Sequence, residues 1–411
     1  MTAKSPICRN CGEPLQQTFV DLGKTPLANS YVPLDRLGRP DNYYPLHARV
    51  CGSCFLVQVD DVVPAEDIFS DYAYFSSYSD SWIAHAKTYA VMMRDRFGLT
   101  SASKMVEIAS NDGYLLQHFV AIGIPVLGVE PAANVAAVAS KKCVATEVAF
   151  FGTETAQRLA LSGHRADAMA SNNVLAHVPD INDFVAGFAI LLKPTGVWTI
   201  EFPHLLNLIE QVQFDTIYHE HYSYLSLLTV ERILAKHGLV VFDVEELSTH
   251  GGSLRVFVGH VNGPHKPAPG LGHVRAKEAI AGLARLSTYD GFTPRVEAVR
   301  DGLLAFLRQA RTQGKRVAAY GAAAKGNTLL NYCGIGTDLV PFVVDRSLEK
   351  QGRLLPGSRL PIYSPQRIID ERVDYVLVLP WNLRKEIADQ MQDIRRSGGK
   401  FVVAIPRLDI F

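Results

Sequence analysis

Two histidines, a glutamate and three tyrosines lie within the stretch FDTIYHEHYSYLS, which runs from Phe214 to Ser226. A base that removes a proton needs a titratable nitrogen or carboxylate, and a developing oxyanion needs a hydrogen-bond donor beside it. Tyr218, Glu220 and His221 therefore form a candidate acid–base group. Because the stretch has neither helical nor strand periodicity, an ordinary polar surface connection is the alternative interpretation.

Four of the six cysteines form two CxxC pairs, CRNC and CGSC, made by Cys8, Cys11, Cys51 and Cys54. This spacing lets one tight turn present two thiolates to one ion, and four thiolates complete a closed tetrahedral zinc site. Redox-active pairs are the alternative, but two matched pairs in a reducing compartment favour structural zinc. Residues 1–66 contain six basic and seven acidic side chains, so this module lacks a footprint for nucleic acid. We expect it to be structural and to cover the active site of the next domain.

Length and composition set the frame for these sites. A chain of 411 residues, 48% of them hydrophobic, is expected to form two or three domains with sizeable cores. The 41 basic and 41 acidic side chains balance, which gives no support to nucleic acid or an anionic membrane as partner. No apolar run approaches the roughly 18 to 20 residues that span a bilayer, and no secretory signal opens the sequence, so we expect a cytoplasmic protein. Cys143 and Cys333 are expected to be inert packing residues.

The middle of the chain alternates between strand and helix patterns. After a loop and an amphipathic helix in residues 71–98, strands are predicted within 104–110, 125–131, 166–178 and 196–203, with helices within 113–123 and 134–144. This alternation is typical of a doubly wound α/β domain with a largely parallel sheet. Residues 228–247 predict a helix and then a strand, and 251–261 predict another strand, which should pair antiparallel with it.

Ligands bind such folds at the carboxyl ends of the strands. Glu107 lies at the end of the first strand, and Gly113 follows where a backbone can approach a ligand closely. Glu130, which ends the second strand, can accept both hydroxyls of a ribose. A nicotinamide dehydrogenase would use the same geometry, but the loop lacks GxGxxG. A plain structural turn is the remaining alternative.

A second, smaller parallel α/β unit is predicted after the Gly/Pro-rich segment 262–273. A long helix within 295–314 leads to four strands, within 315–320, 339–345, 374–380 and 400–406, and helices are predicted within 364–373 and 382–399. YGAAAKG lies at a strand-to-helix turn, where backbone amides attract phosphate and Lys325 adds a charge. Asp345 ends the next strand, where an acid can meet a ribose hydroxyl. The resulting division is 1–66, 67–262 and 263–411.

Several of these motifs occur together in one known family. EIASNDGYLL with GVEP, SNNVLAHVPD, IYHEH, HGGSLRVF and YGAAAKGNTLL, behind two CxxC pairs, resembles the three-domain S-adenosylmethionine-dependent C-methyltransferases of nucleotide-linked keto-sugars. The resemblance covers nearly the whole chain in the same order. It implies an α/β fold with an N-terminal zinc-binding module, a central class I (Rossmann-like) methyltransferase domain and a smaller C-terminal Rossmann-like domain. Ala109 departs from the glycine that many methyltransferases have there.

The resemblance also implies roles for individual residues, with S-adenosylmethionine and structural zinc as cofactors. Glu107 and Gly113 would line the methionine end of S-adenosylmethionine, and Asn172 and His177 would lie beside the sulfonium. The cofactor set is Glu107, Ala109, Asn111, Gly113, Glu130, Pro131, Asn172 and Asn173. The catalytic set is His221, Tyr218, Glu220, His177 and Tyr74, and the substrate set is His250, Ser253, Gly321, Lys325, Asn327 and Asp345.

Methylation at carbon explains the need for acid–base groups, because a carbon beside a ketone must first lose a proton to become an enolate. His221 is the expected base, since its ordinary pKa of about 6.5 lies near working pH. Glu220 would fix the tautomer of His221 or bind a sugar hydroxyl, and Tyr218 or His177 would donate to the enolate oxygen. Tyr74 would reach the pocket from the entry loop.

The glycine pair in STHGGSLRVF leaves two interpretations open: a tight turn only, or a backbone approach to the sugar near His250 and Ser253. The prediction for the whole chain is a C-methyltransferase of a nucleotide-diphosphate keto-sugar, of undetermined oligomeric state. The alternatives are an O- or N-methyltransferase, a nicotinamide-dependent sugar dehydrogenase or epimerase, and a non-enzymatic binding protein.

Overall fold

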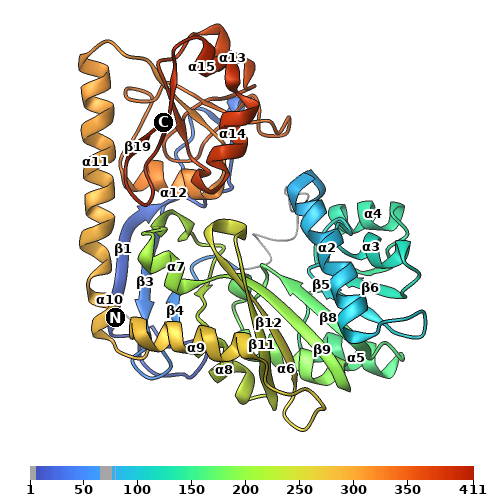
Figure 1. Ribbon diagram of the computed structural model, residues 1–411. Coiled ribbons are helices and arrows are strands. Elements are labelled where there is room, and N and C mark those ends of the chain that lie inside the picture. The colour runs from blue at the N-terminus through green and yellow to red at the C-terminus, as the bar shows by residue number, and fades with distance from the viewer. Residues whose placement is uncertain (1–5, 65–75, 79) are drawn as a thin grey trace.

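The described part of the chain forms three larger sheets and one two-stranded sheet, and Figure 1 shows their arrangement. The structure is a computed structural model and describes residues 6–64, 76–78 and 80–411. Within these ranges, no helix has both the length and the apolar character needed to cross a bilayer.

The first sheet is antiparallel and has the strand order β1-β3-β4-β10. Its strands are β1 (Gln17–Thr25), β3 (Tyr44–Val50), β4 (Val57–Val59) and β10 (Ser223–Tyr224). β10 lies within the stretch 214–226, just after IYHEH, so the N-terminal module pairs directly with the segment that carries the candidate catalytic residues. A further strand of the module, β2 (Val32–Pro33), pairs with β15 (Arg353–Leu354) of the C-terminal region. The short helix η1 (Leu34–Arg36) follows β2 in the module.

The central sheet has the order β11-β12-β9-β8-β5-β6-β7 and is parallel except for β12. Its strands are β5 (Met105–Ile108), β6 (Val126–Val129), β7 (Thr146–Glu147), β8 (Ala166–Asn172), β9 (Leu192–Pro203), β11 (Leu239–Leu247) and β12 (Ser253–His260). The order reverses at β5, which lies between β6 and β8, and ligand sites of doubly wound sheets lie at such a point. The predicted α/β domain and the antiparallel pairing of β11 with β12 are confirmed.

Helices surround this sheet. They are α2 (Asp80–Phe97), α3 (Leu116–Ala121), α4 (Ala133–Lys141), α5 (Thr153–Leu161), α6 (Ile181–Leu191), α7 (Leu205–Glu210) and α8 (Leu227–Ala235), with the short turns η2 (Ser76–Tyr78), η3 (Leu175–His177), η4 (Phe214–Thr216) and η5 (Thr249–Gly251). α8 begins with a capping box, because Ser226 and Thr229 bond to each other's backbone amides. The helix α9 (Pro269–Ala281) packs on β11 and α8, and its Glu278 accepts hydrogen bonds from the first amides of α8.

The third sheet has the order β16-β14-β13-β17-β18-β19. Its strands are β13 (Val317–Tyr320), β14 (Val343–Val344), β16 (Ile362–Tyr363), β17 (Tyr375–Val378), β18 (Lys400–Val403) and β19 (Asp409–Ile410), and only β19 is antiparallel to its neighbour. Its helices are α12 (Ala324–Tyr332), α13 (Gln366–Asp370), η6 (Trp381–Leu383), α14 (Arg384–Gln390) and α15 (Gln392–Arg396).

Two details of the predicted C-terminal unit are wrong. The sheet has six strands instead of four, because β16 and β19 are two-residue strands with no periodicity to detect. The single helix predicted within 382–399 is divided at Met391, whose φ and ψ of −108° and 39° are not helical.

Hydrophobic packing joins the three sheets. One core combines Phe19 and Leu46 of the N-terminal sheet with Phe292 and Leu303 and with the C-terminal sheet. These last two residues belong to α11 (Phe292–Thr312), which follows α10 (Ser287–Asp290) and runs along β1 toward the C-terminal sheet in Figure 1. A second core packs three of the paired cysteines against the interior of the central sheet and its helices. The boundaries at 66/67 and 262/263 stay predictions.

Candidate active site and metal centre

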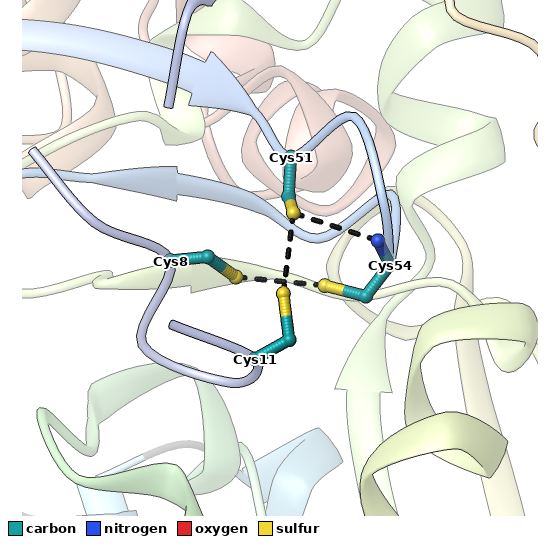
Figure 2. A group of neighbouring side chains, drawn as sticks. All are labelled: Cys8, Cys11, Cys51 and Cys54. Carbon is teal, nitrogen blue, oxygen red and sulfur yellow. Dashed lines mark hydrogen bonds between the residues drawn. The ribbon is translucent and has the colours of Figure 1, made fainter. Parts of the chain in front are cut away.

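The four paired cysteines converge on one point, as Figure 2 shows. The Sγ atoms of Cys8 and Cys54 are 3.5 Å apart, those of Cys11 and Cys51 are 3.4 Å apart, and all four lie within 4.8 Å of one another. Zn–S bonds of about 2.3 Å in a tetrahedron separate sulfurs by about 3.8 Å, so the cluster fits one zinc ion. All four thiols are free, so neither CxxC pair forms the disulfide of the redox interpretation.

Hydrogen bonds to sulfur support a thiolate cluster. The backbone amides of Ser53 and Cys54 point at Cys51 Sγ at 3.4 and 3.5 Å, and the Gln58 amide donates to Cys8 Sγ at 3.2 Å. The metal centre is also attached to the central domain, because Arg9 donates to the carbonyl of Pro179 at 3.0 Å just before α6. A structural zinc site therefore fixes the N-terminal module against the methyltransferase sheet.

The end of β5 carries a tightly shaped loop. Ala109, Asn111 and Gly113 have φ angles of 54°, 49° and 76°, in the left-handed region. A Cβ on Gly113 would lie 3.2 Å from Ala139 Cβ, within α4, and 3.1 Å from Val144 Cγ2. The close approach that requires glycine at 113 is therefore to the protein itself, while an approach of its backbone to a ligand stays a prediction.

Glu130 holds the same loop from the end of β6. Its Oε2 accepts the Asn111 amide at 2.9 Å and its Oε1 accepts the Ala132 amide at 3.0 Å. Burial raises the pKa of Glu130, and these two hydrogen bonds oppose that rise. Each oxygen keeps a further lone pair that can accept a hydrogen bond from a ribose hydroxyl. The ribose contact itself stays a prediction. Pro131 follows with intermediate exposure.

Glu107 is completely buried at the end of β5. Neither of its carboxylate oxygens makes a well-aligned hydrogen bond to a described residue, although the Tyr114 hydroxyl lies beside it, and burial raises its pKa well above the ordinary value. Asn172, at the end of the adjacent strand β8, donates to the Tyr114 hydroxyl at 3.4 Å and has no described partner for its own Oδ1. These buried oxygens have no hydrogen-bond donor from the described residues, so they are able to accept hydrogen bonds from the ammonium group of a bound S-adenosylmethionine.

Glu130 provides a test of the donor site. Glu130→Ala is expected to weaken binding of S-adenosylhomocysteine by about 1.5 to 3 kcal/mol. The substitution removes the predicted charged hydrogen-bond acceptor for the ribose, and it removes the carboxylate that holds the 109–113 loop through the Asn111 amide. Glu130→Gln, which keeps one acceptor, should lose less. Titration calorimetry measures both, with exposed Glu154→Ala as a control. Unchanged affinity in Glu130→Ala would move the ribose contact to another residue.

In the IYHEH loop, His221 has both ring nitrogens bonded. Its Nδ1 lies 2.8 Å from the Thr216 carbonyl and its Nε2 lies 2.8 Å from the Tyr218 hydroxyl. A carbonyl only accepts, so Nδ1 carries the proton, Nε2 holds the lone pair, and Tyr218 donates to it. The prediction that Glu220 fixes this tautomer is therefore wrong, because the Thr216 carbonyl does so.

The electrostatic surroundings keep His221 neutral. Its pKa is lowered well below the ordinary value, first by burial and then by His177, His250 and Lys325, while the bond to Thr216 opposes this. The expectation of a pKa near 6.5 is therefore wrong for this structure. An imidazole that is neutral at pH 7 is nevertheless in the protonation state that a base needs.

His177 lies against the same histidine. Its ring centroid is 4.6 Å from that of His221 in an edge-on arrangement, and its Nδ1 donates to the Glu220 carbonyl at 2.8 Å. Burial lowers the pKa of His177 to about 4. Since η3 follows β8 directly, His177 connects the predicted cofactor side with the IYHEH loop.

Glu220 points to the N-terminal module. Both of its carboxylate oxygens accept hydrogen bonds from the side-chain amide of Asn29, at 2.9 and 2.7 Å. Glu220 is 4% exposed, and burial raises its pKa to about 7 although the Asn29 bonds oppose the rise. A sugar hydroxyl as partner of Glu220 stays a prediction.

The C-terminal substrate set gathers at the turn between β13 and α12. Lys325 donates to Asn382 Oδ1 at 2.7 Å, lies 4.9 Å from the centre of the Trp381 ring, and has its pKa lowered by burial. Asn327 is completely buried with no described partner for either amide atom. Asp345 accepts the amides of Ala322 and Ser347, both at 2.8 Å, so its carboxylate holds the turn. A Cβ on Gly321 would lie 2.4 Å from Pro380 Cδ, so that glycine permits packing.

The glycine pair at 251 and 252 also serves packing. Their φ angles are 89° and 112°, and a Cβ would lie 2.3 Å from the Trp381 ring at Gly251 and 2.3 Å from Asn207 Nδ2 at Gly252. Ser253 is buried and its hydroxyl donates to the Thr249 carbonyl at 3.0 Å, which closes the turn. The tight turn is thus observed, and a backbone approach to sugar stays a prediction.

His250 contacts the predicted cofactor side. Its Nε2 lies 3.2 Å from Asn173 Nδ2, and both residues have positive φ angles, 54° and 56°. Desolvation of the ring and, after it, the charge of Lys325 lower the pKa of His250 to about 4. The structure therefore brings together the last residues of β8, the first residues of β12, the IYHEH loop and α12. Tyr74 lies outside the described residues.

Some contact residues were not predicted. Asp215, just before Thr216, accepts from Trp381 Nε1 at 2.8 Å, and Thr328 of α12 donates to the Ile217 carbonyl at 3.1 Å. With Asn29, they hold the candidate catalytic loop from two sides. Asp215 and Thr328 lie within the motifs FDTIYHEHYSYLS and YGAAAKGNTLL, so their place in these motifs could have identified them as candidates. No motif in the sequence includes Asn29, so it could not have been predicted.

Comparison with known proteins covers the same three regions. Residues 8–69 match a family described as "Putative zinc binding domain", residues 83–244 match "Methyltransferase domain", and residues 248–406 match "C-methyltransferase C-terminal domain". The chain is 37% identical to C-methyltransferase NovU of Streptomyces niveus over 97% of its own length and 95% of that protein. It is 29% identical to a ubiquinone biosynthesis O-methyltransferase of Bartonella bacilliformis, over 26% of this chain and 44% of that protein.

Solved structures are more distant. The glycopeptide N-methyltransferase MtfA covers 43% of this chain and 96% of its own, with 14% identity and a TM-score of 0.34. Magnesium protoporphyrin IX methyltransferase of Synechocystis PCC 6803, with bound SAH, covers 47% and 91%, with 15% identity and a TM-score of 0.36.

The match to NovU extends over zinc module, methyltransferase sheet and C-terminal region alike, and each of these is present in the structure. The chain belongs to the family of zinc-binding, S-adenosylmethionine-dependent C-methyltransferases that includes NovU.

Proposed function

We propose that the enzyme methylates a carbon beside the ketone of a nucleotide-diphosphate keto-sugar, through an enolate, with His221 as the base. The observation that carries this proposal is the state of His221: partly buried, neutral, and fixed by the Thr216 carbonyl with its Nε2 lone pair directed at the Tyr218 hydroxyl. The 37% identity to a C-methyltransferase over 97% of the chain supports methylation at carbon over methylation at oxygen or nitrogen, and over a nicotinamide-dependent or non-enzymatic function.

The chemistry of carbon methylation assigns the steps. S-adenosylmethionine supplies an electrophilic methyl group. His221 Nε2 takes the proton from the carbon beside the ketone, and the electron pair of that C–H bond moves into the enolate. The Tyr218 hydroxyl, released from Nε2, donates to the enolate oxygen. The nucleophilic carbon then forms its bond to the methyl group while the methyl–sulfur bond breaks and its electron pair goes to sulfur, so that S-adenosylhomocysteine leaves and the ketone re-forms. The proton stays on His221 until it passes to solvent.

A nucleotide site in the C-terminal region supports the substrate class. The first turn of α12 contains Lys325 and backbone amides that have no partner within the helix, and the buried side-chain amide of Asn327 has no partner among the described residues. Phosphate oxygens accept from such groups. Lys325 also acts electrostatically on His221 and His250, which links this site to the catalytic loop. Thr328 of α12 also donates to the Ile217 carbonyl at 3.1 Å, so we expect a sugar attached to the diphosphate to lie close to the loop that carries His221.

Hydrogen exchange tests the proposal. Thymidine and uridine diphosphate 4-keto-6-deoxyglucose are suitable probes, incubated in deuterated water with S-adenosylhomocysteine in place of the methyl donor. The enzyme is expected to exchange a hydrogen beside the ketone, because the base acts before methyl transfer, and His221→Asn should lose this exchange. Proton NMR measures it. Exchange by His221→Asn at the rate of the unmodified enzyme contradicts the role of His221.

A further inference from the structure

The N-terminal module reaches into the catalytic loop through one short segment. Asn29 lies between β1 and β2, and its side-chain Nδ2 donates to both carboxylate oxygens of Glu220, at 2.9 and 2.7 Å. Glu220 lies between Tyr218 and His221 in sequence and is 4% exposed, whereas Asn29 is an exposed residue. An exposed residue of one part of the molecule thus orients a buried carboxyl group of another.

The same segment continues to the nucleotide side. The Tyr31 hydroxyl donates to the Ala322 carbonyl at 2.7 Å and lies 3.3 Å from Asn29 Oδ1. Ala322 is in the turn that leads to α12, and its carbonyl also accepts from Lys350 at 3.0 Å, while the Lys350 ammonium lies 5.4 Å from the Tyr31 ring centre. Directly after Tyr31, β2 pairs with β15. Residues 29–33 therefore connect the catalytic loop to the C-terminal turn.

The N-terminal module also holds the backbone on both sides of Glu220. β4 pairs with β10 immediately after the loop, and His219 Nε2 donates to the Pro45 carbonyl at 3.0 Å. With the backbone held in this way, the plane of the Glu220 carboxyl group is set by the Asn29 amide. Each of its oxygens accepts one bond from Asn29 and keeps a lone pair for another donor.

We propose that Asn29 is a positioning residue that fixes Glu220 as the acceptor for a hydroxyl of the sugar, so that the zinc-binding module forms one wall of the substrate site. This inference rests on the proposed sugar substrate. A carboxylate whose plane is fixed by one amide offers its remaining lone pairs in defined directions, which selects among the hydroxyls of a ring. The zinc cluster then serves the reaction by keeping residues 29–33 in place.

The charge on Glu220 gives a test that needs no substrate. Asn29 stabilises the ionised carboxylate, so Asn29→Leu is expected to raise the pKa of Glu220 above about 7. Tyr31 and His177 are titratable neighbours, the first in the same segment and the second bonded to the Glu220 carbonyl. Carbon-13 NMR of labelled glutamate measures the shift, with Glu220→Gln identifying the signal. An unchanged pKa in Asn29→Leu overturns the inference.

Kinetics with the two 4-keto-6-deoxyglucose nucleotides supply the second test. Asn29→Leu is expected to lower kcat/KM by roughly tenfold, mainly through KM, with partial recovery at higher pH where Glu220 ionises. The double variant with Glu220→Gln should be no worse than Glu220→Gln alone, because Asn29 acts only through Glu220. Zinc content and affinity for S-adenosylhomocysteine should not change. Asn42→Leu, at an exposed position of the same module, is the matched control.

The outcomes separate the inference from the proposed function. Equal losses from Asn29→Leu in the presence and absence of Glu220 overturn the positioning role while carbon methylation of the sugar stands. If S-adenosylhomocysteine binds but neither nucleotide sugar is methylated, the proposed substrate is wrong, and the sugar-hydroxyl assignment fails with it. The carboxyl titration then still decides whether Asn29 controls Glu220.

Discussion

His221→Asn is expected to lower the rate of methyl transfer by about 10²- to 10⁴-fold, the range for loss of a general base. Asparagine can keep a hydrogen bond to the Thr216 carbonyl, which His221 Nδ1 now makes at 2.8 Å, but it has no atom in place of Nε2. The loop should therefore stay folded while the proton acceptor is lost. Single-turnover rates measure the effect, and exposed His273→Ala is the control.

Two further measurements identify the cause of that loss. Affinity for S-adenosylhomocysteine should be unchanged in His221→Asn, because the residue acts on the substrate. Tyr218→Phe should retain activity but lose about 3 kcal/mol of transition-state stabilisation, the usual value of one oxyanion donor. Because the pKa of His221 is lowered, its neutral form persists below pH 6.5, and the acidic limb of kcat/KM should lie below that pH. Near-normal turnover in His221→Asn would exclude His221 as the base.

Loss of the metal should have the second large effect. Cys8→Ser is expected to abolish zinc binding and to lower the free energy of unfolding by several kcal/mol, since structural zinc contributes on the order of 10 kcal/mol. The cluster packs in the core shared with the central sheet, so the damage should extend beyond the N-terminal module. Methyl transfer should fall as well, because β4 and Asn29 hold the catalytic loop. Metal analysis and thermal unfolding measure these effects.

Cys143→Ser is the matched control for the zinc prediction. Cys143 is exposed and lies outside the cluster, so its replacement should leave both zinc content and melting temperature unchanged. A Cys8→Ser protein that keeps one zinc per chain and melts like the unmodified protein would contradict the structural role of the metal.

Sequence patterns predicted those parts of the fold that carry strong local signals. The buried runs at 105–108 and 126–129 and the amphipathic helices between strands are specified by nearby residues, and the two CxxC pairs carry their spacing in the sequence. Two-residue strands such as β16 and β19 contain no period, so their pairing depends on neighbours far along the chain. β10 likewise joins β4 only after the whole fold is formed.

The candidate site shows the same limit. Motif residues His177, Tyr218, Glu220 and His221 do come together, because the motifs lie at the ends of strands or in the loops that follow them. Their partners are set by tertiary contact: the Thr216 carbonyl orients His221 and Asn29 binds Glu220. Burial, which no short motif encodes, lowers the pKa of His221 and raises that of Glu220 to about 7. Glycine signals were ambiguous, since a missing Cβ can accommodate either a ligand or another side chain.

The position of the transferred methyl group tests the central claim most directly. The enzyme is incubated with S-adenosylmethionine carrying a carbon-13 methyl group and with thymidine or uridine diphosphate 4-keto-6-deoxyglucose, and the product is examined by carbon–proton correlation NMR. The account predicts a labelled methyl group bonded to a ring carbon beside the ketone, at the position where exchange with deuterated water occurs. A labelled methyl group on oxygen or nitrogen would contradict the enolate mechanism and leave His221 without its role as base.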